Sequence, residues 1–343
     1  MKSLQGPHQL GHPAGGESGR KRLSEKTRKL LGALHRLPCM MSTLGVLPLP
    51  TILFFILCNS LFGYYLINVV PTFSSAWASA AQNIGYGILA LGVFQVLQFV
   101  TGWGAAPTGK FNTGALALPV GLPVWLAWWT MEQPSVLVPA VALAGYFGNG
   151  GVLHPGVVYL GGMFIVHYIQ RSFIYPFLQG TTGRDYPLHA WCFAMLFTAC
   201  NGTMQANDLL YGPVAARSMA DGLYANPRVY LGCAIWAFGL FCNVQADAIL
   251  RNLRPPGSLA AKNRSYVIPR GGLFEYVSGA HFVGEIIEWS GYAIACWSYA
   301  PLCFAAFNWM GIGTRAIATH DWNVEKFGAD YPKHRKRLIP FVW

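Results

Sequence analysis

Hydrophobic residues in this chain occur in long blocks instead of alternating with polar residues. A transmembrane helix needs about 20 mainly apolar residues. The blocks predict eight spans, near residues 50–70, 83–103, 119–146, 154–178, 188–212, 228–250, 277–291 and 293–312. Because lipid offers the backbone no hydrogen-bonding partners, the fold class predicted is an all-α, polytopic membrane bundle.

The composition agrees with a membrane protein. Apolar residues make up 53% of the 343 residues and charged residues 11%, whereas soluble domains carry roughly 25% charged residues. A net charge of +11 would suggest nucleic-acid binding in a soluble protein, but here it follows the membrane topology, and we expect no nucleic-acid partner. The eight cysteines form no CxxC pair and mostly lie in apolar blocks, so we expect neither a disulfide framework nor a metal site.

The positions of lysine and arginine test the number of spans. With a cytosolic N-terminus and eight spans, 21 of the 24 basic residues fall on the cytosolic side; the exceptions are Arg171, Arg217 and Arg228. Such an asymmetry is typical of the positive-inside rule. It predicts that both termini are cytosolic, and that Asn263, in an Asn-Arg-Ser sequon, carries no glycan.

The chain divides into three parts. Residues 1–48 are polar and basic, and we predict a disordered cytosolic tail; a basic amphipathic helix on the membrane surface and a mitochondrial presequence are the alternatives. Residues 49–82 contain the first span, and residues 83–343 form the main membrane domain.

Four spans carry polar residues at helical spacing, although ionisable groups are expensive at membrane depth. A single such stripe often joins helices by hydrogen bonds, whereas four stripes suggest a polar cavity large enough for an elongated cofactor. No GxGxxG after a strand and no P-loop occurs, so a nucleotide would be held inside the bundle. The stripes comprise Tyr168, Arg171 and Tyr175; Asn201, Gln205 and Asp208; Asn243, Asp247, Arg251 and Arg254; and His281, Glu285 and Glu288.

Glu132 stands apart from these stripes, in the sequence WLAWWTMEQPS of the third span. Two interpretations are open. Its aromatic neighbours would keep the acid protonated, so that it donates a hydrogen bond; alternatively, it is a carboxylate near a span end, where Pro134 kinks the chain toward water.

The C-terminal quarter closely resembles the steroid 5α-reductases (3-oxo-5α-steroid 4-dehydrogenases). The matching text includes IPRGGLFEYVSGAHFVGEIIEW and, near the end, YPKHRK and IPF. WWTMEQPS and HYIQRSFIY resemble the segments that carry the family's catalytic glutamate and tyrosine. The resemblance covers about residues 84–343. Because the family has seven spans, the first span here resembles an addition.

The resemblance implies an NADPH-dependent enzyme of the endoplasmic reticulum membrane that reduces the 4,5 double bond of a 3-oxo-4-ene steroid. Glu132 and Tyr168 take the positions of the two catalytic residues, which hydrogen-bond the 3-ketone. The expected contacts of the cofactor, or residues supporting its site, are Arg171, Asn201, Gln205, Asn243, Asp247, Arg254, His281, Glu285, Arg315 and Arg335.

Three departures leave the substrate open. The family usually has Asn at His281, Gln at Met131 and often Tyr at Asn323. The alternatives are a related reductase of a polyprenol or enoyl-CoA, an isoprenylcysteine or phospholipid methyltransferase, and a non-catalytic lipid-binding relative. Methyltransferases would show Arg-His-Pro where this chain has Ser278–Gly279–Ala280, and the presence of Glu132 and Tyr168 favours an enzyme.

Overall fold

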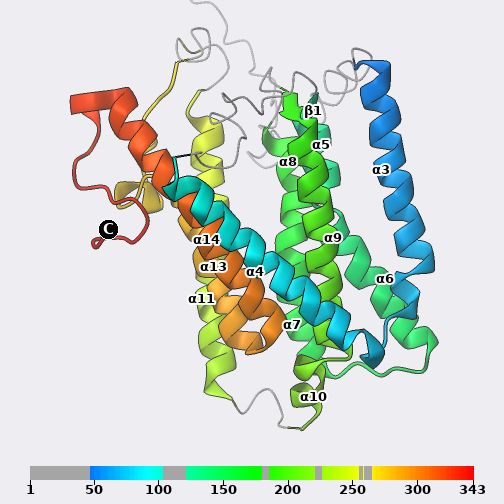
Figure 1. The fold of residues 1–343 in the computed structure, drawn as a ribbon. Helices are drawn as coiled ribbons and strands as arrows, with labels where there is room; N and C mark the ends of the chain where they lie inside the picture. Colours follow the sequence, from blue (N-terminus) through cyan, green and yellow to red (C-terminus); the bar gives the residue numbers. More distant parts are fainter. Residues whose placement is uncertain (1–46, 103–120, 180–184, 221–225, 255–257, 259–264) are drawn as a thin grey trace, which may run out of the picture.

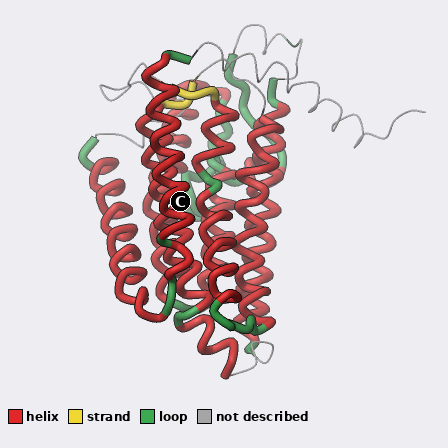
Figure 2. Tube along the Cα trace, turned by 90° about the vertical axis from the view of Figure 1, so that its right-hand side faces the viewer, coloured by secondary structure: helices red, strands yellow, loops and turns green. Residues whose placement is uncertain are grey.

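The computed structural model describes residues 47–102, 121–179, 185–220, 226–254, 258 and 265–343. Nearly all of the predicted N-terminal tail, together with Lys110, Arg184 and Asn263, lies outside the described residues. The helices stand side by side as one bundle (Figures 1 and 2). The elements are α3 (Leu49–Asn68), η2 (Val70–Thr72), η3 (Ser75–Trp77), α4 (Ala78–Val100), β1 (Gly121–Pro123), α5 (Val124–Met131), α6 (Pro134–Gly148), α7 (Pro155–Ile169), η5 (Gln170–Ile174), α8 (Tyr175–Gln179), β2 (Asp185–Pro187), α9 (Leu188–Leu210), α10 (Pro213–Ala220), α11 (Pro227–Asn252), η7 (Gly272–Glu275), α13 (Ala280–Cys296), α14 (Tyr299–Phe327) and η8 (Gly328–Asp330).

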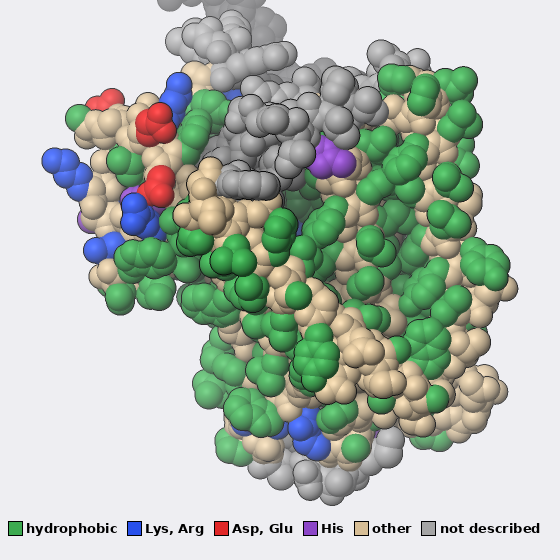
Figure 3. Space-filling view, viewed as in Figure 1, with side chains coloured by type: hydrophobic (Ala, Val, Ile, Leu, Met, Phe, Trp, Pro, Cys, Tyr) green, Lys and Arg blue, Asp and Glu red, His purple; other side chains and the backbone are tan. Residues whose placement is uncertain are grey.

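The predicted class, an all-α membrane protein, is confirmed. Within the described residues, four helical segments are long and apolar enough to cross a membrane: Leu49–Thr72, Ser75–Val100, Pro155–Leu178 and Pro227–Asn252. Hydrophobic side chains cover much of the face shown in Figure 3, whereas charged side chains gather near its two ends. In Figure 1, α3 begins and α14 ends toward the same end of the bundle. The short strands β1 and β2 pair antiparallel at this end.

The third predicted span, 119–146, is wrong as a single helix. Helix α5 ends at Met131 and α6 begins at Pro134, so that Glu132 lies in the break between them. Proline lacks a backbone N–H and its ring excludes the preceding turn, and it therefore favours the first position of a new helix. The break brings the Glu132 backbone out of regular helical hydrogen bonding.

The boundary between the last two predicted spans is also corrected. Helix α13 continues to Cys296, and the chain then turns at Trp297, whose backbone is left-handed (φ 49°, ψ 46°). Helix α14 runs to Phe327, well past the predicted end near residue 312. Hydropathy detects only the apolar part of a helix, so it missed the polar C-terminal half of α14.

Arg217 and Arg228, which lie outside the predicted cytosolic set, both bind the C-terminal end of α13. Arg217 Nη2 donates to the carbonyl of Cys296 at 2.8 Å, and Arg228 Nη1 donates to that of Ile294 at 2.8 Å. The last carbonyls of a helix have no partner within the helix, and cations near them are favourable. These arginines therefore have a local structural role.

Helices α11 and α13 pack with their backbones close together because glycines line the contact. A Cβ atom at Gly239 would overlap the backbone of Glu288, and one at Gly284 would overlap the backbone of Asn243. Small residues allow membrane helices this close approach. The packing holds Asn243 beside α13, where its Nδ2 donates to the His281 carbonyl at 2.9 Å.

Candidate active site

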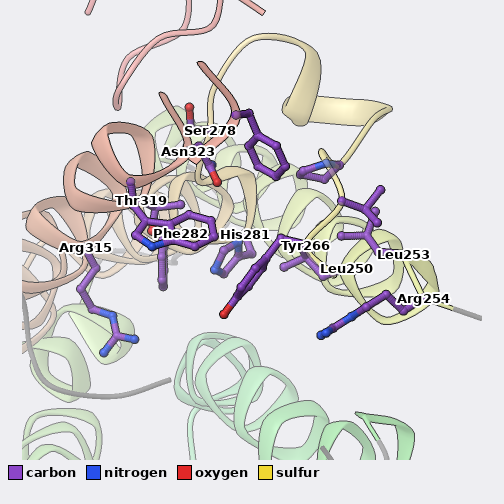
Figure 4. Close-up of a pocket in the computed structure, with 14 residues that line it drawn as sticks. Leu250, Leu253, Arg254, Tyr266, Ser278, His281, Phe282, Arg315, Thr319 and Asn323 are labelled. Atoms are coloured by element: carbon purple, nitrogen blue, oxygen red, sulfur yellow. The ribbon is translucent and has the colours of Figure 1, made fainter. Parts of the chain in front are cut away.

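A cavity of about 320 Å³ opens where the C-terminal end of α11 meets α13 and α14. Arg254, His281 and Arg315 line it, and Figure 4 shows the Arg254 and Arg315 side chains extending toward the same space. Aromatic side chains form part of the wall: Tyr266 and Trp322 meet edge to face at 4.6 Å. Cations and aromatic rings in one cavity suit a ligand that has both phosphates and planar rings.

Arg171 joins η5 to α11 and α13 through ion pairs. Its Nη1 lies 2.8 Å from Oδ2 of Asp247 on α11, and its Nη2 lies 3.9 Å from Oε2 of Glu285 on α13. Arg171 belongs to η5, a single π-helical turn, a feature frequent at functional sites. Its guanidinium also lies over the rings of Trp128 and Tyr175, at 5.0 and 4.6 Å from their centroids. Arg171 is thus held from four sides.

A second buried pair lies one turn deeper. Nδ1 of His167 is 2.8 Å from Oε1 of Glu288, and both side chains are almost completely buried. Trp289 packs against the same imidazole, with the ring centroids 4.5 Å apart. Glu288 therefore faces α7, a partner that the stripe on the seventh predicted span did not identify.

Tyr168 lies beside this pair, in a hydrogen-bonded chain that crosses three helices. Asn201 Nδ2 donates to the Tyr168 hydroxyl at 3.3 Å, and Gln205 Nε2 donates to Asn201 Oδ1 at 3.3 Å. The Tyr292 hydroxyl lies 3.5 Å from Gln205 Oε1. All four side chains are buried. Asn201 and Gln205 thus act on Tyr168 directly or through one another.

Glu132 approaches the same region from the break between α5 and α6. Its side chain is only partly buried, and it interacts electrostatically with Arg171 and Glu285. Ser135, one turn later, lies beside the Tyr168 hydroxyl and donates to the Thr198 carbonyl at 3.4 Å. The break therefore places Glu132 in the same region of the bundle as Arg171 and Tyr168.

Arg335 lies in the segment that follows α14 and η8. It is buried, its Nη2 is 3.6 Å from Oε2 of Glu275, and its guanidinium lies over the Tyr331 ring. The hydrogen bond from the Gly271 amide, together with Arg335, holds the pKa of Glu275 below its usual range. Among the described residues, none accepts a hydrogen bond from the Arg335 guanidinium.

The three residues that depart from the family pattern have different surroundings. His281 and Asn323 line the cavity at the end of the bundle. Asn323 Nδ2 donates to the Tyr331 hydroxyl at 3.4 Å, which in turn donates to Ser278 Oγ at 2.6 Å. Met131 is buried in an apolar cluster with Trp125 and Trp191, directly before Glu132.

Polar side chains lie at successive turns along α13 and on the helices beside it, and this row of residues is called the polar path. Along α13, His281 lines the cavity and Tyr292 meets Gln205, and eleven residues of helix separate them by about 16 Å. Asn243, Asp247 and Glu285 lie between those ends. At the cavity end, Arg254 and the half-buried Arg315 supply cations, and no described residue hydrogen-bonds Nε of Arg315, so this end fits the anionic part of an elongated group such as a dinucleotide.

The sequence did not predict several residues of the site. His167 directly precedes Tyr168, yet only a structure shows that it pairs with Glu288 from another helix. Tyr266, Phe282, Thr319 and Trp322 line the cavity although they belong to no predicted polar stripe. Aromatic residues are common in membrane proteins, so their type alone gives no signal.

Comparisons with known proteins find one family, both as a family model and as curated relatives. A family model described as 3-oxo-5-alpha-steroid 4-dehydrogenase matches residues 184–343. 3-Oxo-5-alpha-steroid 4-dehydrogenase 1 of Bos taurus is 42% identical over 240 residues, which cover 69% of this chain and 88% of the relative. 3-Oxo-5-alpha-steroid 4-dehydrogenase 2 of Homo sapiens is 40% identical over 276 residues, covering 79% of this chain and 97% of the relative.

Proposed function

This chain belongs to the 3-oxo-5-alpha-steroid 4-dehydrogenase family, and from that premise we propose that it reduces the 4,5 double bond of a 3-oxo-4-ene steroid with NADPH. It is a membrane protein and a steroid double-bond reductase by family. We propose the cofactor, the carbon that receives hydride and the roles of individual residues.

The observation that carries the proposal is the hydrogen bond from Asn201 Nδ2 to the Tyr168 hydroxyl. Because Asn201 acts as donor, the tyrosine oxygen is an acceptor there and its own O–H is left to donate. In the free enzyme Ser135 lies beside that hydroxyl. A substrate ketone placed there would accept a hydrogen bond from the Tyr168 hydroxyl.

Glu132 supplies the second donor when it is protonated. Hydride addition to C5 of a conjugated enone builds negative charge on the carbonyl oxygen. Donors fixed in a water-poor site stabilise such an oxyanion, and loss of one donor typically costs about 2.7–4 kcal/mol of transition-state stabilisation. Tyr168 lies on α7 and Glu132 lies in the break between α5 and α6, so the two proposed donors come from different segments of the chain.

NADPH, when bound, supplies the hydride. The residues of this chain that would hold it follow the polar path from the cavity to Tyr168. Arg254 and Arg315 extend into the cavity where phosphates would lie, and the planar guanidinium group binds two phosphate oxygens at once. A cation for the 2′-phosphate favours NADPH over NADH. His281 lines the same cavity, and Asn243 donates to the His281 carbonyl.

Arg171, Asp247 and Glu285 have a supporting role in this proposal. Their charges are satisfied within the protein, since Arg171 pairs with both carboxylates. They fix α11 and α13 against α7 and so set the width of the path. We further propose an endoplasmic reticulum location with both termini cytosolic, which places the open cavity on the NADPH-containing side.

The experiment is NADPH consumption by the purified full chain with a panel of 3-oxo-4-ene steroids, enoyl-CoAs and polyprenols. The expected result is turnover with at least one steroid enone and formation of the 5α-reduced ketone. Turnover restricted to an enoyl-CoA or a polyprenol would assign a different reductase, and NADPH oxidation by none of the panel would overturn the proposal.

A further inference from the structure

A second cavity, of about 450 Å³, lies on the other side of α9 from the site described above. Its α9 wall comprises Cys192, Met195, Leu196, Ala199, Cys200 and Thr203. Asn201 stands two residues from both Ala199 and Thr203, and Gln205 stands two residues from Thr203. Two residues correspond to about 200° around the helix. The body of α9 therefore separates this cavity from Tyr168, and it is a different site.

The outer wall of the second cavity is α3, which forms one edge of the bundle (Figure 1). The cavity is elongated and has one polar end. At that end the Tyr65 hydroxyl is 2.5 Å from Thr203 Oγ1. At the other end the thiol sulfurs of Cys58 and Cys192 are 4.0 Å apart. The eleven residues of α9 from Cys192 to Thr203 correspond to about 16 Å.

The cavity opens sideways, toward lipid. Leu61 of α3 and Leu196 of α9 line it and are 62% and 65% exposed. Tyr65 lies in the last turn of α3, and Trp77, just before α4, also lines the cavity. Tyrosine and tryptophan are enriched where membrane meets water, so these two residues place the hydroxyl end of the cavity toward that boundary.

The lining restricts the chemistry of a ligand. None of the described residues that line the second cavity is charged, so a phosphate headgroup would find no cation among them. The polar groups near the membrane boundary are two hydroxyls, and the remaining walls are apolar, with the flat ring of Phe62 on one side. Ligand pockets of 300–1,000 Å³ with a few placed polar groups are typical of small-molecule sites.

We propose that the second cavity binds a membrane sterol: a rigid, elongated, apolar molecule with one hydroxyl group. The hydroxyl group hydrogen-bonds Tyr65 and Thr203, and the fused rings fill the space between α3 and α9. The site contains neither Glu132, Tyr168 nor any residue assigned to the nucleotide, so it goes beyond the proposed reaction. A ligand that binds the folded state stabilises it, and a sterol here would fix α3 against the bundle.

The test is photolabelling of the full chain in nanodiscs with a cholesterol that carries a diazirine and an alkyne, followed by peptide mapping. We expect the label on peptides that contain residues 58–65 or 192–203, with unlabelled cholesterol competing and phosphatidylcholine not competing. Cholesteryl methyl ether, which has no hydroxyl proton to donate, should compete at least fivefold less well.

Two variants and one control complete the test. Ala199→Phe fills the cavity and should reduce labelling at least tenfold, whereas Ile56→Phe, on the opposite, exposed face of α3, should leave it unchanged. Tyr65→Phe combined with Thr203→Val removes both hydroxyls with little change in volume. This double variant should abolish the preference for cholesterol over its methyl ether, and it decides the question if Ala199→Phe does not fold.

Three outcomes would overturn the proposal. They are label confined to peptides of α7 or α13, which would mark the proposed substrate site; equal competition by phosphatidylcholine; and full labelling of the folded Ala199→Phe variant. The labelling requires no turnover, so its result can be interpreted even if the reductase proposal fails.

Discussion

Arg171 Nη1 lies 2.8 Å from Asp247 Oδ2, and this pair joins the π-helical turn after α7 to α11 inside the bundle. Both side chains are buried. An ion pair in such a place is not by itself strong evidence for stability, because both charges have left water. Removing one partner leaves the other charge buried without compensation, whereas replacing both partners by apolar residues leaves no buried charge.

We therefore predict that Asp247→Asn destabilises the fold by about 3–5 kcal/mol, the range for breaking a buried pair. The double variant Arg171→Met/Asp247→Leu should recover most of that loss while still failing to bind NADPH normally. The measurement is unfolding in mixed micelles with increasing SDS. Asp321→Asn, which breaks the exposed pair with Arg337, is the control and should change stability by about 1 kcal/mol or less. Wild-type stability of Asp247→Asn would contradict the prediction.

Glu132 allows a comparison of two substitutions. Glu132→Gln keeps a hydrogen-bond donor in place of the proposed protonated acid, whereas Glu132→Ala removes it and leaves Tyr168 alone with the ketone. We expect the Ala variant to lose more kcat than the Gln variant, with NADPH affinity unchanged in both. Steady-state kinetics and NADPH titration measure this. If both variants raise KM and leave kcat unchanged, Glu132 only binds substrate.

The sequence predicted the stripes of polar residues but not their partners. Spacing places Glu285 and Glu288 on one face of a helix, and the structure pairs each with a different residue, Arg171 and His167. Such pairs depend on how helices far apart in the chain pack together. Periodicity describes one helix at a time, so it contains no information on that packing.

Two features of the fold show the same limit. Pro134 signalled a disturbance near Glu132, but hydropathy alone favoured one span where the structure has α5 and α6. The second cavity joins Tyr65 to Thr203, 138 residues away. Neither residue lies in a stripe that the sequence distinguished, because a single tyrosine or threonine is common in membrane helices.

Cofactor selectivity follows from the arginines of the cavity. Arg254→Ala should raise the apparent KM for NADPH about tenfold or more, with a smaller effect on the steroid KM, because a charge-assisted hydrogen bond to phosphate contributes roughly 1.5–3 kcal/mol. Arg337→Ala, an exposed arginine that does not line the cavity, is the control. The wild type should prefer NADPH to NADH. Equal use of both nucleotides would contradict the assignment of these arginines to the phosphates of NADPH.

The membrane orientation makes a prediction about glycosylation. With both termini cytosolic, the sequon at Asn263 faces the cytosol, and Asn201 of the Asn-Gly-Thr sequon is buried within α9. Both asparagines should be unmodified after expression in a eukaryotic host. Mass spectrometry of the purified chain checks this. A glycan on Asn263 would contradict this orientation, because it would place the Asn263 loop on the lumenal side.

The most stringent prediction concerns Tyr168. Tyr168→Phe keeps the ring that packs 4.7 Å from Phe164 and 5.8 Å from Trp289, so the bundle should remain folded. It removes only the hydroxyl that receives the Asn201 hydrogen bond. The developing enolate then loses one donor, and kcat should fall about 10²–10³-fold, as for deletion of an oxyanion-hole donor. NADPH affinity should be unchanged, because Tyr168 is not assigned to the nucleotide.

The matched control for Tyr168→Phe is Tyr146→Phe, which removes a hydroxyl that donates to the Val152 carbonyl outside the site. It should retain wild-type kcat. Asn201→Ala should show a smaller loss than Tyr168→Phe, because the tyrosine hydroxyl remains but is no longer oriented. Stopped-flow measurement of NADPH oxidation separates these rates from product release. Reduction of a steroid enone at the wild-type rate by folded Tyr168→Phe would show that this hydroxyl does not polarise the ketone.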